Sequence, residues 1–220
     1  MNQLLQSLQE FTVSADYSRT HTTWEVRATG QRTPVLLMHK DSPHHSLPEY
    51  RVYAPESPDE ILGFVLSTGM AFAADRRQIG EMRTGPWEDR EWILVQHDLG
   101  ELTGKWKGLN TRFRRAPVID NFLGHESLDA LLSAKVGFSG PQSEGFDFAR
   151  RAGIRAEYEV TVRDPRMDRL LILAWVVHFN WHHSVDPRKT AVDLTTNPFR
   201  DLGAARRAKK RRQTGQTEQN

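Results

Sequence analysis

The chain has 220 residues, of which 38% are hydrophobic and 26% charged, and this composition suits one folded domain with tails. Basic residues number 30 and acidic residues 28, so neither a strongly acidic nor a strongly basic body is expected. The absence of cysteine excludes disulfides, thiolate zinc sites, thiol nucleophiles and palmitoyl anchors. The first residues, MNQLLQSLQEF, lack the basic start and continuous apolar core of a secretory signal. We therefore expect a cytoplasmic protein.

The chain divides by composition into three parts. At the N-terminus, Leu4, Leu8 and Phe11 are spaced to share one face of a helix, which predicts a helical segment over residues 1–13. We expect it to pack on a sheet, and insertion at a membrane interface is the alternative. A β-rich domain is predicted over residues 14–185. Residues 186–220 are rich in Pro, Thr, Asn, Arg and Lys and are predicted to form a basic, largely disordered tail.

Short stretches with a period of two fill the middle of the chain. They alternate apolar and polar residues and are separated by turn residues, while no helical pattern alternates with them. The stretches are TTWEVRATGQ, EYRVYAPESPDEILGFVLST, MAFAADRRQIGEM, REWILVQHDLGELTGKWKG and AEYEVTVRDPR. This pattern predicts an antiparallel sheet, sandwich or barrel rather than an α/β sheet.

An apolar block, PRMDRLLILAWVVHFNWHH, lies between Pro165 and His183. A helix of about ten residues rises roughly 15 Å, half of the roughly 30 Å that a bilayer span must cross, so no transmembrane span is predicted. A segment that is apolar on all sides belongs inside a protein, and Asp168 is placed to cap its N-terminus. We predict a buried helix. Its core residues are Leu170, Leu171, Leu173, Trp175, Val177 and Phe179.

Four passages of the chain resemble a known family. They are DRRQIGEM, WILVQHDLGELTGKW, FSGPQSEGFDFARRAGI and YEVTVRDPRMDRLLILAWVVHF. The chain from residue 14 to 179 resembles the phospholipid scramblase and LURP-one-related family, which shares the Tubby C-terminal-like fold. The last passage is similar to the family's ending of strand, D-x-x-x-D and apolar helix. The resemblance implies a mainly β fold, a closed antiparallel barrel of about twelve strands around a central C-terminal hydrophobic helix.

The chain also departs from the membrane scramblases. It has no cysteine cluster, and its short N-terminus contains no proline. Asp164 and Asp168 are the only acids in RDPRMDRLL, which is too few oxygen ligands for a calcium loop. A helix needed in the core is not available to move lipids. Lipid translocation is therefore not expected.

The stretch KWKGLNTRFRR is the strongest binding signal. On a strand, Lys105 and Lys107 point to one face and Trp106 to the other, and Arg112 and Arg114 likewise alternate with an aromatic residue. Four cations on two neighbouring strands suit anionic phospholipid head groups, phosphoinositides included, or nucleic-acid phosphates. The alternative is an ordinary solvated outer face of the barrel.

A second basic signal, ARRAKKRR, lies near the C-terminus. Its cations are Arg206, Arg207, Lys209, Lys210, Arg211 and Arg212. A run of this density suits contact with anionic membranes or with nucleic acid, and the alternative is a tail that only increases solubility.

Signals for catalysis or metal binding are weak. His178 and His182 are spaced to share a helix face, but no glutamate completes a zinc pattern, and no metal or cofactor is predicted. Nucleotide-binding, hydrolase and kinase motifs are absent from the sequence. We predict a non-enzymatic module of the scramblase and LURP-one type that associates peripherally with anionic lipid surfaces. The alternative is a structural or protein-interaction domain with an unidentified partner, which contacts nucleic acid through the tail.

Overall fold

The computed structural model describes residues 3–42, 49–84, 92–107, 134–151 and 157–183. Within these ranges, twelve antiparallel strands form one closed barrel in the order β1-β12-β11-β10-β9-β8-β7-β6-β5-β4-β3-β2. The strands therefore follow one another around the barrel, and β12 returns to pair with β1. This confirms the predicted fold class, a mainly β closed barrel with a C-terminal helix.

The barrel elements are short, as expected for a chain with frequent turn residues. The strands are β1 (Glu10–Tyr17), β2 (Thr22–Ala28), β3 (Leu36–Lys40), β4 (Tyr50–Ala54), β5 (Ser57–Val65), β6 (Met70–Ala73), β7 (Gln78–Thr84), β8 (Trp92–Gln96), β9 (Gly100–Trp106), β10 (Ala134–Gly140), β11 (Ser143–Arg150) and β12 (Glu157–Val162). The described helices are α1 (Gln3–Ser7) and α4 (Arg169–His183).

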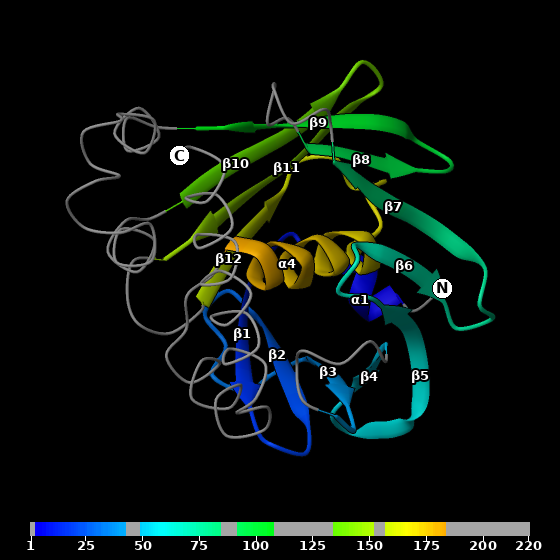
Figure 1. The fold of residues 1–220 in the computed structure, drawn as a ribbon, viewed down its shortest axis with the longest axis vertical. Coiled ribbons are helices and arrows are strands. Elements are labelled where there is room, and N and C mark those ends of the chain that lie inside the picture. The colour runs from blue at the N-terminus through cyan, green and yellow to red at the C-terminus, as the bar shows by residue number, and fades with distance from the viewer. Residues whose placement is uncertain (1–2, 43–48, 85–91, 108–133, 152–156, 184–220) are drawn as a thin grey trace, which may run out of the picture.

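The apolar block forms α4, which runs through the middle of the barrel (Figure 1). The predicted core residues, Leu170, Leu171, Leu173, Trp175, Val177 and Phe179, are all between 0% and 3% exposed. Burying each such side chain contributes on the order of 1.5–3 kcal/mol before conformational entropy is counted. A wide barrel must be filled to avoid cavities, and this helix is the filling.

Aromatic rings from the strands surround the centre of α4. The ring of Trp175 lies 5.2 Å from that of Trp92, 4.8 Å from that of Phe138 and 5.8 Å from that of Phe148, measured between centroids. All three contacts are edge-to-face, the geometry that aromatic pairs prefer. The helix is therefore fixed against several strands of the wall, not against one neighbour.

The strands alternate inward and outward residues with a period of two, as the sequence predicted. In β8, for example, Trp92, Leu94 and Gln96 are buried while the residues between them are partly exposed. Strand β7 has a glycine where it packs against α4. A Cβ atom at Gly80 would collide with the carbonyl oxygen of Val95 and lie 2.9 Å from Leu171. The close packing of β7 on the helix thus depends on this glycine.

The predicted N-terminal helix is wrong in its extent. Helix α1 ends at Ser7, and Phe11 lies in β1, where it pairs with Val160 of β12. Leu5 and Leu8 face the core, whereas Leu4 is 41% exposed. The sequence EFTVSADY alternates with the period of a strand, and pairing with both neighbours outweighs the weak helical spacing of Leu4, Leu8 and Phe11.

No helix within the described ranges combines the length and the apolar content that a membrane crossing requires. The core helix α4 has 15 residues.

Candidate functional site

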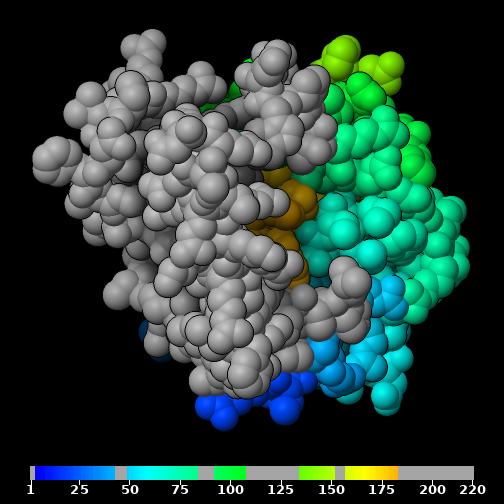
Figure 2. Space-filling model, in the orientation of Figure 1, coloured from blue at the N-terminus to red at the C-terminus, as the bar shows by residue number. Residues whose placement is uncertain are grey.

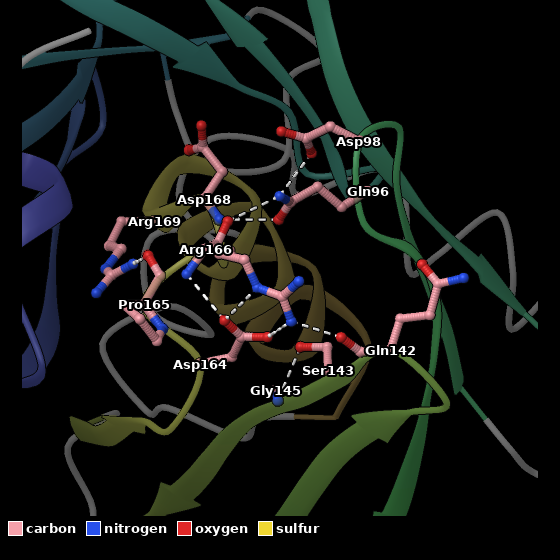
Figure 3. Close-up of polar contacts among 10 residues, drawn as sticks. All are labelled: Gln96, Asp98, Gln142, Ser143, Gly145, Asp164, Pro165, Arg166, Asp168 and Arg169. Carbon is pink, nitrogen blue, oxygen red and sulfur yellow. Dashed lines mark hydrogen bonds and ion pairs between the residues drawn. The ribbon is translucent and has the colours of Figure 1, made fainter.

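A network of polar side chains holds the N-terminal end of α4 (Figure 3). The Asp168 carboxylate accepts the backbone N–H of Leu170 at 2.8 Å, which is the predicted N-cap. The backbone N–H of Asp168 donates to the Gln96 side chain at 2.8 Å, and the Gln96 amide donates to Asp98 and to the Arg166 carbonyl. Burial raises the pKa of Asp168, and the hydrogen bond from Leu170 partly offsets this effect. These groups satisfy one another, so the network anchors the helix.

A second polar contact lies beside this network. Arg166 donates to both carboxylate oxygens of Asp164, at 3.0 and 2.8 Å, and to the carbonyl of Gln142 in the β10–β11 turn at 2.5 Å. The hydrogen bonds from Arg166 hold the pKa of Asp164 well below its usual range. An open hollow of about 520 Å³ lies here, lined by residues 140–144 and 163–166. Its arginines and acids are balanced in number, so it has no clear charge preference.

The outer face of β9, β10 and β11 carries an uneven distribution of charge. We define the basic cluster as Lys105, Lys107, Lys135 and Arg163, which surround Asp147. The Lys107 ammonium lies 2.5 Å from the Asp147 carboxylate, and the Arg163 guanidinium lies 3.5 Å from the same oxygen. Two cations thus share one carboxylate, and two further lysines flank them.

The strand register brings the two flanking lysines to the cluster. Gly137 pairs with Lys105 on one side and with Asp147 on the other, so Lys105 and Asp147 lie in one row across three strands. The backbone of Lys107 donates to the carbonyl of Lys135 at 2.8 Å, which places these two residues side by side. Both Lys105 and Lys135 are exposed to solvent. Four cations and one carboxylate therefore occupy a small part of the outer wall.

Six other arginines of the described surface pair with carboxylates, whereas exposed arginines such as Arg19, Arg32 and Arg77 carry no ion pair among the described residues. Each arginine that forms an ion pair outside the basic cluster has one or two carboxylates of its own. The pairs are Arg27 with Glu25, Arg51 with Asp41, Arg76 with Glu49, Arg83 with Glu81 and Glu101, Arg151 with Glu157 and Glu159, and Arg166 with Asp164. Exposed pairs of this kind contribute little to stability. What distinguishes the basic cluster within the described surface is that two cations lie at one carboxylate oxygen with two further lysines in neighbouring register, an arrangement that could receive an anionic partner.

The structure places only part of the predicted basic site. Lys105 and Lys107 lie on the outer face, and Trp106 points inward, where its ring lies 4.9 Å from that of Trp92. Arg112 and Arg114 lie outside the described residues, as do the tail cations Arg206, Arg207, Lys209, Lys210, Arg211 and Arg212.

Sequence reasoning missed Lys135 and Arg163. Lys135 is the second residue of β10, which pairs with β9, but it lies 28 positions after Lys107, so no local spacing connects them. Arg163 follows β12, and its guanidinium reaches the carbonyl of Phe138 at 2.9 Å and that of Phe146 at 3.4 Å. Only the order of strands around the barrel brings both residues to Asp147.

The inside of the barrel becomes polar where α4 ends. The hydroxyls of Tyr17 and Tyr158 lie 3.1 and 2.8 Å from the side-chain oxygen of Asn180, near the helix end. Lys40 points inward from β3, is 1% exposed, and lies 4.7 Å from the centre of the Tyr50 ring. Desolvation lowers the pKa of Lys40 to about 8 and raises that of Tyr50. A cation at a helix C-terminus also faces the negative end of the helix dipole.

The same end of α4 can be reached from outside. Trp181 is partly exposed and His182 is exposed, and Figure 2 shows some atoms of α4, in orange, at the surface beside the teal strands. The ring centroids of His178 and His182 lie 4.4 Å apart, and His178 Nδ1 lies 3.1 Å from the carbonyl of Ser67. Within the described ranges, no group of three or more His, Asp or Glu side chains is placed to hold a metal ion.

Comparison with known proteins identifies no family for this chain. No family model, no curated protein and no solved structure matches the chain.

Proposed function

We propose that this chain is a non-enzymatic binding module that associates peripherally with anionic lipid surfaces through the basic cluster. The observation that carries the proposal is the cluster itself, in which Lys107 and Arg163 meet at Asp147 and the strand register brings Lys105 and Lys135 beside them among the described residues. Each Lys or Arg near an anionic membrane contributes about 1 kcal/mol of attraction. Four such side chains on one face give a useful affinity without any inserted segment.

The burial of α4 supports a peripheral mode of association. Its residues from Leu170 to Phe179 are at most 6% exposed and fill the barrel. Moving these residues out of the barrel would expose the hydrophobic core and lose the free energy gained by burying it, so the helix must stay inside the barrel. A cytoplasmic protein of this kind meets the membrane with its outer face, where the charged residues are.

Kinship with the phospholipid scramblase and LURP-one-related family is part of the same proposal. A closed barrel around a C-terminal helix is the architecture that the resemblance implies, and it supports the kinship at the level of fold. Fold alone does not define function, so the proposed activity depends on the basic cluster.

Vesicle sedimentation tests the proposal. We expect the full chain to sediment with vesicles that contain anionic lipid and not with zwitterionic vesicles, and we expect rising salt to release it. Replacing Lys105→Glu and Lys135→Glu together removes two attractive contacts, about 2 kcal/mol, and adds two repulsive charges, so binding should weaken by more than about thirtyfold.

The matched control is Arg19→Glu with Arg32→Glu. These two exposed arginines lie on the β1–β2 and β2–β3 connections, so the pair makes the same change in net charge away from the cluster. It should bind nearly as the wild type does. Unchanged binding of the lysine variant, together with loss of binding when residues 204–220 are removed, would contradict the proposal and assign binding to the tail.

A further inference from the structure

Strand β5 is longer than its neighbour β6, so part of its edge has no strand beside it. Strand β5 has 9 residues and β6 has 4, and β6 pairs only with Gly63, Phe64 and Val65. We define the open edge as residues 57–62. It pairs with β4 alone, and within the described residues no hydrogen bond connects it to another element. Because successive residues of a strand direct their N–H and C=O groups to opposite sides, about half of these groups face away from β4.

The turn that ends β6 is fixed beside the paired part of β5. After Ala73 the chain reverses, and the Arg76 N–H donates to the Ala73 carbonyl at 3.0 Å. The Arg76 guanidinium lies 3.6 Å from the centre of the Phe64 ring and donates to both carboxylate oxygens of Glu49, at 2.5 and 2.6 Å. Residues 58–60 remain exposed. The turn therefore does not cover the open edge.

Negative charge is concentrated along the open edge. Asp59 and Glu60 lie on it, and Glu56 lies in the turn just before it. All three side chains are exposed, and none forms an ion pair with a described residue. Charges on a strand edge disfavour pairing with a second copy of the same edge, because like charges would then meet. The same charges attract a strand that carries positive charge.

We infer that the open edge of β5 is an interaction surface that adds an extended, basic segment of a partner protein as a further strand. Main-chain hydrogen bonds align such a segment, and the acidic side chains select a basic one. Six residues of strand extend over about 20 Å, which suits about six residues of the partner. Strands β6, β7 and β8 separate β5 from β9, where the basic cluster begins, so this surface is distinct from the proposed lipid-binding face.

Binding of a model peptide tests the inference. The probe is a fluorescent peptide of about seven residues that alternates lysine and valine, and fluorescence anisotropy gives its affinity for the full chain. We expect binding that weakens as salt rises. The same peptide with every backbone amide methylated keeps its charge but cannot donate a main-chain hydrogen bond, and it should bind at least about tenfold more weakly. Equal binding of the two peptides would overturn strand addition.

A pair of charge reversals tests the role of the acids. Asp59→Lys with Glu60→Lys should weaken binding of the lysine peptide by at least about tenfold, because attraction becomes repulsion. The matched control is Glu10→Lys with Glu144→Lys, two exposed acids of β1 and β11 that also form no ion pair with a described residue. The control makes the same change in net charge and should bind within about twofold of the wild type. An equal loss in both variants would contradict the inference, because it would show attraction to the whole chain.

Amide hydrogen exchange locates the contact on the full chain. The lysine peptide should slow exchange severalfold within residues 57–62 and leave residues 63–65 unchanged, since these already pair on both sides. Binding without slower exchange at the open edge would overturn the inference. A dimer of the free chain in analytical ultracentrifugation, with the open edge already protected, would assign the edge to a second copy. Peptide binding that appears only after removal of residues 204–220 would assign it to the chain's own tail, and both results would exclude the partner segment.

Discussion

The two faces of strand β9 differ in what determines their residues. Leu102 and Gly104 point into the barrel and are buried, whereas Lys105 and Lys107 point outward and are exposed. The inner face is constrained by volume, because any change there alters the packing around α4. Volume constrains the outer face less, and its residues differ mainly in charge. The comparison indicates that single substitutions on the outer face can change the charge of the surface without altering the packing of the core.

A charge at the centre of the inner core should have the largest effect. Leu173 is 0% exposed in the middle of α4, so Leu173→Asp would bury an unpaired carboxylate and should cost more than about 4 kcal/mol. We expect loss of cooperative thermal unfolding by circular dichroism. Leu173→Met conserves volume and should cost less than about 1.5 kcal/mol. A well-folded aspartate variant would contradict the placement of α4.

The buried lysine at the far end of the barrel should give the next largest effect. The pKa of Lys40 is about 8 in the folded chain, below the ordinary value of 10.5, so between pH 8 and pH 10 the unfolded chain binds the proton that the folded chain has released. The free energy of unfolding should therefore rise with pH, by about 2 kcal/mol over this interval. Above pH 10 the raised pKa of Tyr50 reverses the trend, because the unfolded chain then loses its phenol proton first.

Urea unfolding at several pH values measures this effect. Lys40→Met should abolish the rise between pH 8 and pH 10, and the same substitution at the exposed Lys135 should leave it intact. A rise that persists in Lys40→Met would assign the proton to another group.

Paired substitutions on β9 compare the two faces directly. Leu102→Ala on the inner face should cost about 2–5 kcal/mol, since Leu102 is 0% exposed. Lys105→Ala on the outer face should change stability by less than about 0.5 kcal/mol. Chemical denaturation of both variants provides the measurement. A large loss of stability from Lys105→Ala would show that the outer face also contributes to the fold.

Much of the inner architecture could be predicted from the sequence, because period and apolar content are local properties. The block from Leu170 to Phe179 is too short to span a bilayer and is apolar on all sides, so it was predicted to lie in the protein core. The hairpins around Asp75 and around residues 98–100 followed from strand patterns and turn residues. The N-terminal segment was the exception, because a helix spacing and a strand alternation overlap at Phe11.

The outer site could be predicted only in part. Alternation gives the directions of Lys105 and Lys107 relative to Trp106, which need no knowledge of other strands. The approach of Lys135, Asp147 and Arg163 depends on register between strands that are distant in the sequence. The inward direction of Lys40 did have a local signal, since it follows Leu36 and Met38 at intervals of two in β3. A lysine at the end of an apolar row is easily taken as exposed.

The most direct test of the account is a map of which lysines contact the membrane. The full chain is acetylated briefly in the presence of anionic or zwitterionic vesicles, and mass spectrometry gives the extent of reaction at each lysine. We predict that anionic vesicles protect Lys105, Lys107 and Lys135 severalfold and that zwitterionic vesicles do not. Equal reaction of these three lysines with and without anionic vesicles, with protection confined to Lys209 and Lys210, would contradict a lipid-binding face on the barrel.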